Sequence, residues 1–94
     1  PKPLEGTTSP KLMVVLKESD GNIIIERFSP GSVSERSGLK IGDIILALDG
    51  VAVSTIDDIK IHLFFKQKGD TVKVKVRRKT FLLGDREKEF DVIF

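Results

Sequence analysis

The stretch that decides the fold is SPGSVSERSGLKIGDIILALDGV, residues 29–51, in which turn, helix and strand signals follow one another closely. Ser32 and Glu35 stand in the S-x-x-E arrangement of a capping box, which predicts a short helix beginning at Ser32. Gly38 suits the left-handed residue that ends a helix, so this helix reaches only to about Ser37.

Three apolar runs of strand length lie in and before this stretch. The run 44–48 is followed by Asp49-Gly50, a strong hairpin-turn pair. Residues 12–16 and 23–25 flank the turn sequence 19–22 and predict a hairpin. Continuous apolar character on both of its strands indicates that both faces are covered, or that one is covered only when a partner binds.

A longer helix is expected after the third run. Thr55 with Asp58 three residues later forms a second capping pattern, and Gly69 supplies a stop, so we predict a helix over 56–67. At 100° per residue, Ile61 and Phe65 lie on its second side. One broad face holds Ile56, Ile59, Lys60, Leu63, Phe64 and Gln67.

The last two strands alternate apolar and charged residues, over 71–77 and 90–94. We predict that they pair antiparallel with Val76 opposite Val92, which places Arg77 opposite Asp91 and Lys79 opposite Glu89. This register requires a connection centred near Gly84, such as Leu83-Gly84-Asp85. It places Phe81, Leu82 and Leu83 near the tip, where nothing in the chain is expected to cover them.

Length and composition describe one small domain. The chain has 94 residues, a net charge of +2 and no cysteine, and it contains no apolar run of the roughly 20 residues that span a bilayer. Residues 1–10 hold three of the four prolines and are interpreted as a linker or loop leading into a single domain over 11–94. We expect the chain to be a piece of a larger protein.

The run Ser29-Pro30-Gly31-Ser32, followed by Gly38-Leu39-Lys40-x-Gly42-Asp43-Ile44-Ile45-Leu46-x-x-Asp49-Gly50, resembles the signature of a PDZ domain. In particular it is similar to the bacterial type found in HtrA-like, tail-specific and site-2 proteases. The resemblance implies a mainly β (α+β) fold, a small, partly open antiparallel β-barrel or sandwich with one short and one longer helix. It also implies a bacterial parent protein that is extracytoplasmic, in the periplasm, or membrane-associated.

Catalytic and metal-binding constellations are missing from the sequence. His62 is the single histidine, there is no nucleophile elbow, and the adjacent Asp57 and Asp58 point in different directions on a helix. We therefore expect no catalysis, metal or cofactor in this domain.

Nucleic acid is the weakest of the binding hypotheses. It rests on the basic residues of 73–79, which alternate with valines as on a solvated strand face and have no interleaved aromatic residues for base stacking. We expect neither nucleic-acid binding nor direct insertion into a membrane.

Recognition of an extended peptide is the leading prediction. A strand with a free edge can accept a further strand, and 12–16 is the candidate. The PDZ resemblance implies a groove between this strand and the long helix, with a preceding loop whose N–H groups hold a terminal carboxylate. By position, the groove residues are Lys11, Leu12, Met13, Val14, Val15 and Leu16 on the strand side and Ile56, Lys60 and Leu63 on the helix.

The candidate carboxylate loop departs from the family pattern. Residues 9–13 contain no glycine, and Pro10 removes one backbone donor. Hydrophobic C-terminal segments and extended internal segments are therefore both candidate ligands, for a substrate-sensing or regulatory domain of a larger protein.

The alternative is a structural docking domain that packs on its own parent chain and binds no free peptide. Five apolar residues that the fold does not need in its core motivate this hypothesis: Ile61, Phe65, Phe81, Leu82 and Leu83.

Overall fold

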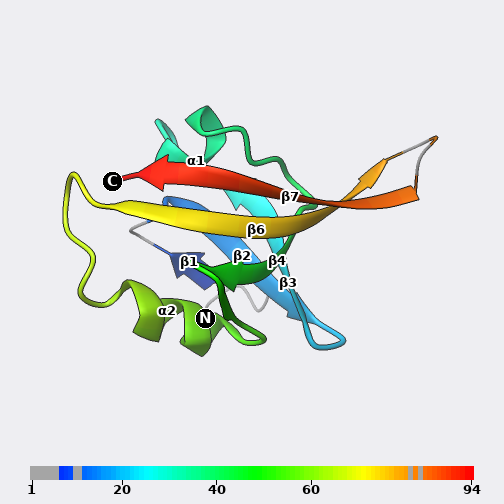
Figure 1. Cartoon of the computed structure of the whole chain (residues 1–94), viewed down its shortest axis with the longest axis horizontal. Helices are drawn as coiled ribbons and strands as arrows, with labels where there is room; N and C mark the ends of the chain where they lie inside the picture. Colours follow the sequence, from blue (N-terminus) through cyan, green and yellow to red (C-terminus); the bar gives the residue numbers. More distant parts are fainter. Residues whose placement is uncertain (1–6, 10–11, 81, 83) are drawn as a thin grey trace, which may run out of the picture.

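The computed structural model describes residues 7–9, 12–80, 82 and 84–94, and these form strands and two helices around one core (Figure 1). In chain order the elements are β1 (Thr7–Ser9), β2 (Val14–Ser19), β3 (Asn22–Phe28), α1 (Val33–Arg36), β4 (Ile44–Leu48), β5 (Val51–Ala52), α2 (Ile56–Leu63), β6 (Thr71–Thr80) and β7 (Gly84–Ile93). No helix in this part of the chain is long and apolar enough to cross a membrane.

All strands belong to one antiparallel sheet in the order β1-β2-β3-β4-β6-β7, with β5 paired to β4 beside this path. The sheet is open, with β1 and β7 as its two edges, and does not close into a barrel. The prediction of a mainly β, antiparallel fold with one short and one longer helix is confirmed.

Two tight turns fix the hairpins. Asp20 and Gly21 join β2 to β3 with φ of 52° and 78°, and Asp49 and Gly50 join β4 to β5 with φ of 50° and 81°. Positive φ at both central residues defines the turn type whose twist matches antiparallel strands, which explains the Asp-Gly pairs. Both hairpins were expected from the sequence.

The short helix α1 begins and ends as its sequence predicts. Ser32 is the N-cap, and its side chain accepts a hydrogen bond from the Glu35 N–H. At the other end Gly38 has a φ of 109° and donates to the Glu35 carbonyl, while Leu39 donates to the Ser34 carbonyl. These two bonds satisfy carbonyls of the last turn in a Schellman arrangement, and they turn Leu39 into the core.

Helix α2 has the predicted start but ends earlier than predicted. Thr55 and Asp58 form a reciprocal capping box. The helix stops at Leu63 rather than near residue 67, because the Phe64 N–H donates to the Ile61 carbonyl and the chain tightens into turns. Phe64, which the longer predicted helix placed on the same face as Ile59 and Leu63, therefore lies past the end of the helix and is 70% exposed.

The predicted register of the last two strands was wrong by four positions. Val92 lies opposite Val72, so that Val76 faces Lys88. Apolar alternation restricts the register only to even steps, which keep the same faces together. The observed register pairs all ten residues of each strand, and the ladder continues as Phe94 exchanges hydrogen bonds with the turn 69–70.

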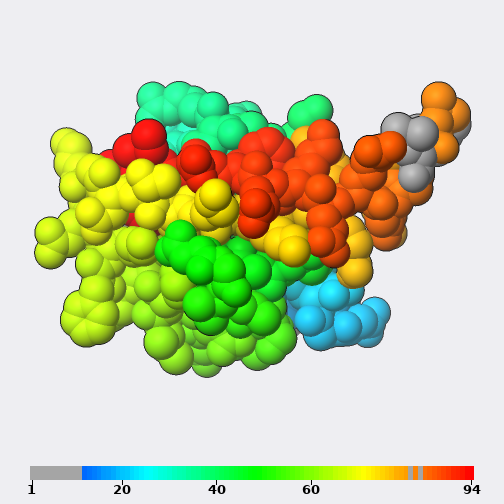
Figure 2. Space-filling view, viewed as in Figure 1, coloured from blue at the N-terminus to red at the C-terminus, as the bar shows by residue number. Residues whose placement is uncertain are grey.

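Past Arg77, β6 pairs with β7 alone, and the two strands project as an arm of residues 78–80 and 84–86. Figures 1 and 2 show this arm standing out from the rest of the molecule. Leu82 at its tip is 85% exposed, in agreement with the expectation that nothing covers it; Phe81 and Leu83 lie outside the described residues.

The core is a single cluster between the sheet and the helices. Its members are Leu12, Val14, Leu16, Ile23, Ile25, Leu39, Ile45, Leu48, Val53, Ile59, Leu63, Val72, Val74, Val76 and Val92. Strands β2, β3, β4, β6 and β7 and helix α2 contribute residues to this cluster, and Val33 of α1 packs against it.

Candidate functional site

The strand side of the predicted groove is anchored in the core. Leu12, Val14 and Leu16 are fully buried, and Val15 is 9% exposed. Met13 is half-buried, and Lys11 lies outside the described residues. The apolar run of this strand is therefore largely core, and what β2 can offer a partner is chiefly its backbone edge.

Helix α2 packs against the same cluster. Leu63 shares the core with the β2 side chains, and Ile56 is partly buried against it, whereas Lys60 is exposed. The Glu18 carboxylate of β2 also accepts a hydrogen bond from the Ile56 N–H, with Oε1 to N at 2.6 Å. The structure therefore brings the strand and helix residues together, with Lys60 at the solvent side.

The turn that leads into β2 is fixed to helix α1. The Leu12 carbonyl accepts a hydrogen bond from Ser34 Oγ at 2.6 Å and a longer one from Ser32 Oγ at 3.4 Å. The Met13 carbonyl accepts from the Ser29 N–H at 2.9 Å. The sequence showed Ser32 only as a cap and gave no role to Ser34, because these contacts join residues about twenty positions apart.

Met13 holds this turn in a conformation that normally favours glycine, with a φ of 58°. A left-handed non-glycine residue is uncommon and carries a cost in backbone strain. Turns of this handedness bring successive N–H groups toward one side, which is the geometry that binds carboxylates. The chain thus forms a turn here without the glycine motif whose absence was noted in its sequence.

The outer edge of β2 is occupied by the chain itself. Strand β1 pairs with it antiparallel, with Thr7 opposite Leu16, Thr8 opposite Val15 and Ser9 opposite Val14. In Figure 1, β1 is drawn on the side of β2 toward α2. The sequence interpretation assumed a free edge, whereas Thr7–Ser9 occupy it over Val14, Val15 and Leu16; among the described residues no strand pairs with this edge beyond Leu16.

An ion-pair cluster lies at the end of α2 away from its cap. The Asp49 carboxylate contacts His62 Nε2 at 2.9 Å and Lys66 Nζ at 3.1 Å, and it accepts from the Lys73 N–H. Partial burial alone would raise the pKa of Asp49, but these hydrogen bonds, with Lys73 the strongest, outweigh it and lower the pKa to about 2. The cluster fastens α2 to the β4–β5 turn.

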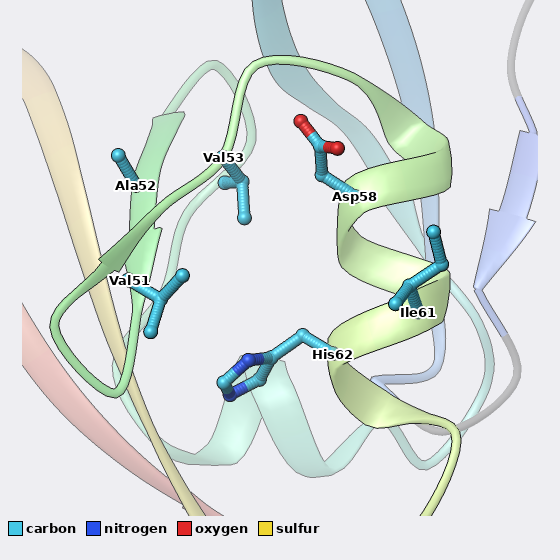
Figure 3. Close-up of a pocket in the computed structure, with 6 residues that line it drawn as sticks. All are labelled: Val51, Ala52, Val53, Asp58, Ile61 and His62. Carbon is cyan, nitrogen blue, oxygen red and sulfur yellow. The ribbon is translucent and has the colours of Figure 1, made fainter.

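Figure 3 shows a pocket beside this cluster, between α2 and β5. It has a volume of about 230 Å³ and is lined by Val51, Ala52, Val53, Asp58, Ile61 and His62. A second hollow of about 330 Å³ lies over Lys60, Ile61, Phe64 and Phe65. Ile61 on α2 and Phe65, just past the end of the helix, are 72% and 83% exposed, so together they form an apolar surface, as the sequence indicated.

Asp43 and Arg78 form a buried ion pair that sequence reasoning missed. Arg78 donates from Nε and Nη2 to the two carboxylate oxygens at 2.8 and 2.7 Å, and from Nη2 to the Gly38 carbonyl at 3.0 Å. Its guanidinium also lies over the Phe90 ring, 5.1 Å from the centroid. Arg78 was interpreted as part of a solvated basic face, but its partner lies 35 residues away and only the fold brings them together.

Within the described residues, no cluster of three or more histidine, cysteine, aspartate or glutamate side chains could hold a metal ion. Of the basic run 73–79, Lys75 pairs with Glu87, Arg77 lies 3.9 Å from Asp85, and Arg78 pairs with Asp43. Much of the charge that motivated the nucleic-acid hypothesis is therefore paired within the domain.

A small antiparallel sheet with strand β2 packed beside a capped helix is an arrangement to which an extended polypeptide can be added as a further strand. The PDZ domain family matches residues 10–93, so the chain belongs to the PDZ family.

Three relatives illustrate the range of proteins that contain a segment similar to this chain. The chain is 32% identical over 82 residues to a putative serine protease, HhoA, of Synechocystis sp., a match that covers 87% of this chain and 19% of the relative. It is 39% identical over 57 residues to the serine protease Do-like HtrA of Bacillus subtilis, covering 60% and 13%. It is 36% identical over 76 residues to human protein lin-7 homolog B, covering 80% and 37%.

The chain thus spans less than a fifth of the length of either protease. PDZ domains are protein- and peptide-binding modules that are in general non-catalytic, and the matches cover only this region of the proteases.

Proposed function

We propose that this domain binds a hydrophobic C-terminal or extended polypeptide segment along the outer edge of β2, with α2 as the second wall. The pairing of β1 with β2 is the observation that supports the proposal most strongly, because a strand of this chain already lies antiparallel along the same edge. Main-chain hydrogen bonds supply the attraction, and side chains beside the edge supply selectivity.

The two elements that form the walls of the groove are fixed in place by hydrogen bonds within the domain, so the walls themselves need no rearrangement for binding. The β2 turn is tied to α1 by the hydroxyl of Ser34, and the first turn of α2 is tied to β2 by Glu18. Lys60 is the exposed cation of the helix wall, where it attracts a carboxylate at the end of a peptide or an acidic residue within it. With strand addition and few apolar contacts available, we expect weak affinity.

The parent protein in this proposal is a larger bacterial protein of the HtrA-like class, outside the cytoplasm or at a membrane. There the domain senses substrate segments or regulates the protease. The similarity to two proteins named as serine proteases supports this role.

A nuclear magnetic resonance titration of the 94-residue chain tests the proposed site. The ligand is a peptide that ends in Val-Val-Phe, used once with a free carboxylate and once amidated. We expect shifts of the β2 amides and of the first two turns of α2. Shifts with the free acid alone indicate C-terminal recognition, shifts with both forms indicate extended internal segments, and no shift with either form refutes the proposed site.

Charge reversal separates the groove from the rest of the surface. Lys60→Glu should weaken binding of the free-acid peptide several-fold if this lysine faces the ligand. Lys88→Glu is the matched control, because Lys88 is exposed on β7 at the opposite edge of the sheet. Equal effects of the two substitutions would show that only overall charge matters and would remove Lys60 from the site.

A structural docking domain is the second candidate function. It is favoured by the exposure of Ile61, Phe65 and Leu82, which the isolated fold does not bury. Replacing Phe65 by serine should leave the isolated domain as stable as before and weaken its packing on the rest of the parent chain. If the isolated domain unfolds instead, Phe65 contributes to the core and this candidate fails.

A further inference from the structure

The strand that occupies the proposed peptide edge belongs to the same chain. β1 pairs with three consecutive residues of β2, Val14, Val15 and Leu16, and runs antiparallel to them. An added peptide strand would use the same backbone donors and acceptors on that edge. One edge accepts one strand, so β1 and a peptide exclude each other over these residues.

We propose that β1 is an intramolecular competitor that keeps the peptide edge of β2 closed, and that ligand binds by displacing it. The inference rests on the proposed function, since it concerns regulation of that same edge. It assigns a role to Thr7–Ser9, which the sequence placed in a linker.

The length and composition of β1 make it a weak competitor. Its sequence is Thr-Thr-Ser, three residues none of which is large and apolar. Three residue pairs make few hydrogen bonds, each of modest net value, against the entropy of ordering the strand. A closed state favoured about tenfold, or about 1.4 kcal/mol, fits these terms.

The extent of β1 also leaves a starting point for displacement. It covers β2 only as far as Leu16, and Lys17 to Ser19 have no partner strand on that side among the described residues. A peptide longer than three residues can pair first with this open part and then replace β1 toward Val14. Peptides long enough to pair with Lys17 to Ser19 should therefore bind more tightly than shorter ones.

Release of β1 does not dismantle the site beneath it. The turn at Leu12 and Met13 is held from the other side by Ser34 and Ser29, and β2 is paired with β3 along its whole length. The receptor edge thus persists when the competitor leaves. This is the arrangement that an autoinhibited binding site requires.

The test compares the full chain with Thr7→Pro/Thr8→Pro. Alternate N–H groups of a strand point to opposite sides, so proline at two consecutive positions removes a ladder donor whichever of the two faces β2. We expect the Val-Val-Phe peptide to bind this variant about tenfold more tightly than the unmodified chain, because the fraction of competent protein rises. Thr7→Val/Thr8→Val is the matched control, which keeps both donors and should bind no more tightly than the unmodified chain.

A reversible cross-link provides the second variant. Thr8→Cys/Val15→Cys joins directly opposed residues, whose Cα separation in an antiparallel pair lies within disulfide range, and the chain has no other cysteine. The oxidised form should lose at least tenfold in affinity relative to the same protein when reduced.

Equal affinities of the proline variant and the unmodified chain, together with equal affinities of the oxidised and reduced cross-linked protein, would overturn the competitor role and leave peptide binding intact. Absence of binding to every form, the proline variant included, would overturn the proposed function and this inference with it.

Discussion

Replacing Arg78 by alanine should lower the free energy of unfolding by about 3 kcal/mol. The side chain of Arg78 is 15% exposed and that of its partner Asp43 is 2% exposed. Breaking a buried ion pair by removing one member costs about 3–5 kcal/mol, because the remaining charge is left without its partner. We choose the lower end because the Lys40 N–H continues to donate to Asp43 at 2.9 Å.

Urea unfolding followed by circular dichroism measures this loss. With a denaturant slope of about 1.3 kcal/mol per molar, the midpoint should fall by about 2 M. Lys79→Ala is the matched control, since Lys79 is an exposed neighbour on β6 and should change stability by no more than about 0.5 kcal/mol. The double variant Asp43→Ala/Arg78→Ala should cost clearly less than the sum of its single substitutions, because it leaves no unpaired charge.

The reasoning is refuted if Arg78→Ala costs no more than Lys79→Ala. Strict additivity in the double variant would refute it as well, because independent effects would mean that the two side chains are not coupled. In that case the three hydrogen bonds of the guanidinium contribute no more than contacts with water would.

Three further predictions concern local features. Gly38→Ala should lower the free energy of unfolding by about 2 kcal/mol, since φ is 109° and the added Cβ would lie 2.9 Å from the Phe90 ring. Gly31→Ala, at φ 73° in open space, should lower it by about 1 kcal/mol, and equal midpoints of the two variants in thermal unfolding would show that the Phe90 ring moves aside. Thr55→Ala should lower stability by about 1 kcal/mol through loss of the α2 cap, and an unchanged urea midpoint would contradict this. Because the pKa of Asp49 is about 2, below its ordinary 3.8, its contribution is present above pH 3.8 and is lost as the pH falls toward 2. Asp49→Asn should therefore reduce the loss of stability between pH 3.8 and 2 by at most about 1 kcal/mol after solvent screening. An unchanged dependence of stability on pH over this range would exclude the Asp49 carboxylate as its cause.

The features that the sequence predicted well are those encoded by neighbouring residues. The caps at Ser32 and Thr55, the Gly38 stop and both Asp-Gly turns depend on backbone preferences within four or five positions. Such signals can be recognised in a single sequence because the groups that hydrogen-bond to each other are close together in the chain.

The features that it missed depend on contacts between distant segments. Apolar alternation could not distinguish the pairing of Val92 with Val76 from its pairing with Val72, because both keep the same faces together. The partner of Arg78 and the role of Ser34 follow from packing between distant elements. The end of α2 at Leu63 was missed because the periodic pattern continues past the point where the chain tightens.

The sequence predicted where the candidate site lies, but it did not predict that the edge of β2 is occupied. Residues 12–16 and the face of α2 with Leu63 were identified from pattern and resemblance, and the structure brings them together in one cluster. Occupation of the edge by Thr7–Ser9 carried no sequence signal, since the prolines around these residues favour an irregular segment.

The outer part of the β6–β7 arm, beyond the Arg78–Asp43 ion pair, gives the domain a part whose length can change without repacking. Beyond Arg77 the two strands pair with each other alone, and the residues of β7 from Gly84 to Glu89 are exposed. Shortening or lengthening the arm by one residue on each strand preserves every pairing below it, whereas a single insertion forces a bulge or inverts the faces of one strand. Length variation at this position should therefore come in pairs of residues, which makes the arm a natural graft point for a reporter peptide or a longer recognition loop.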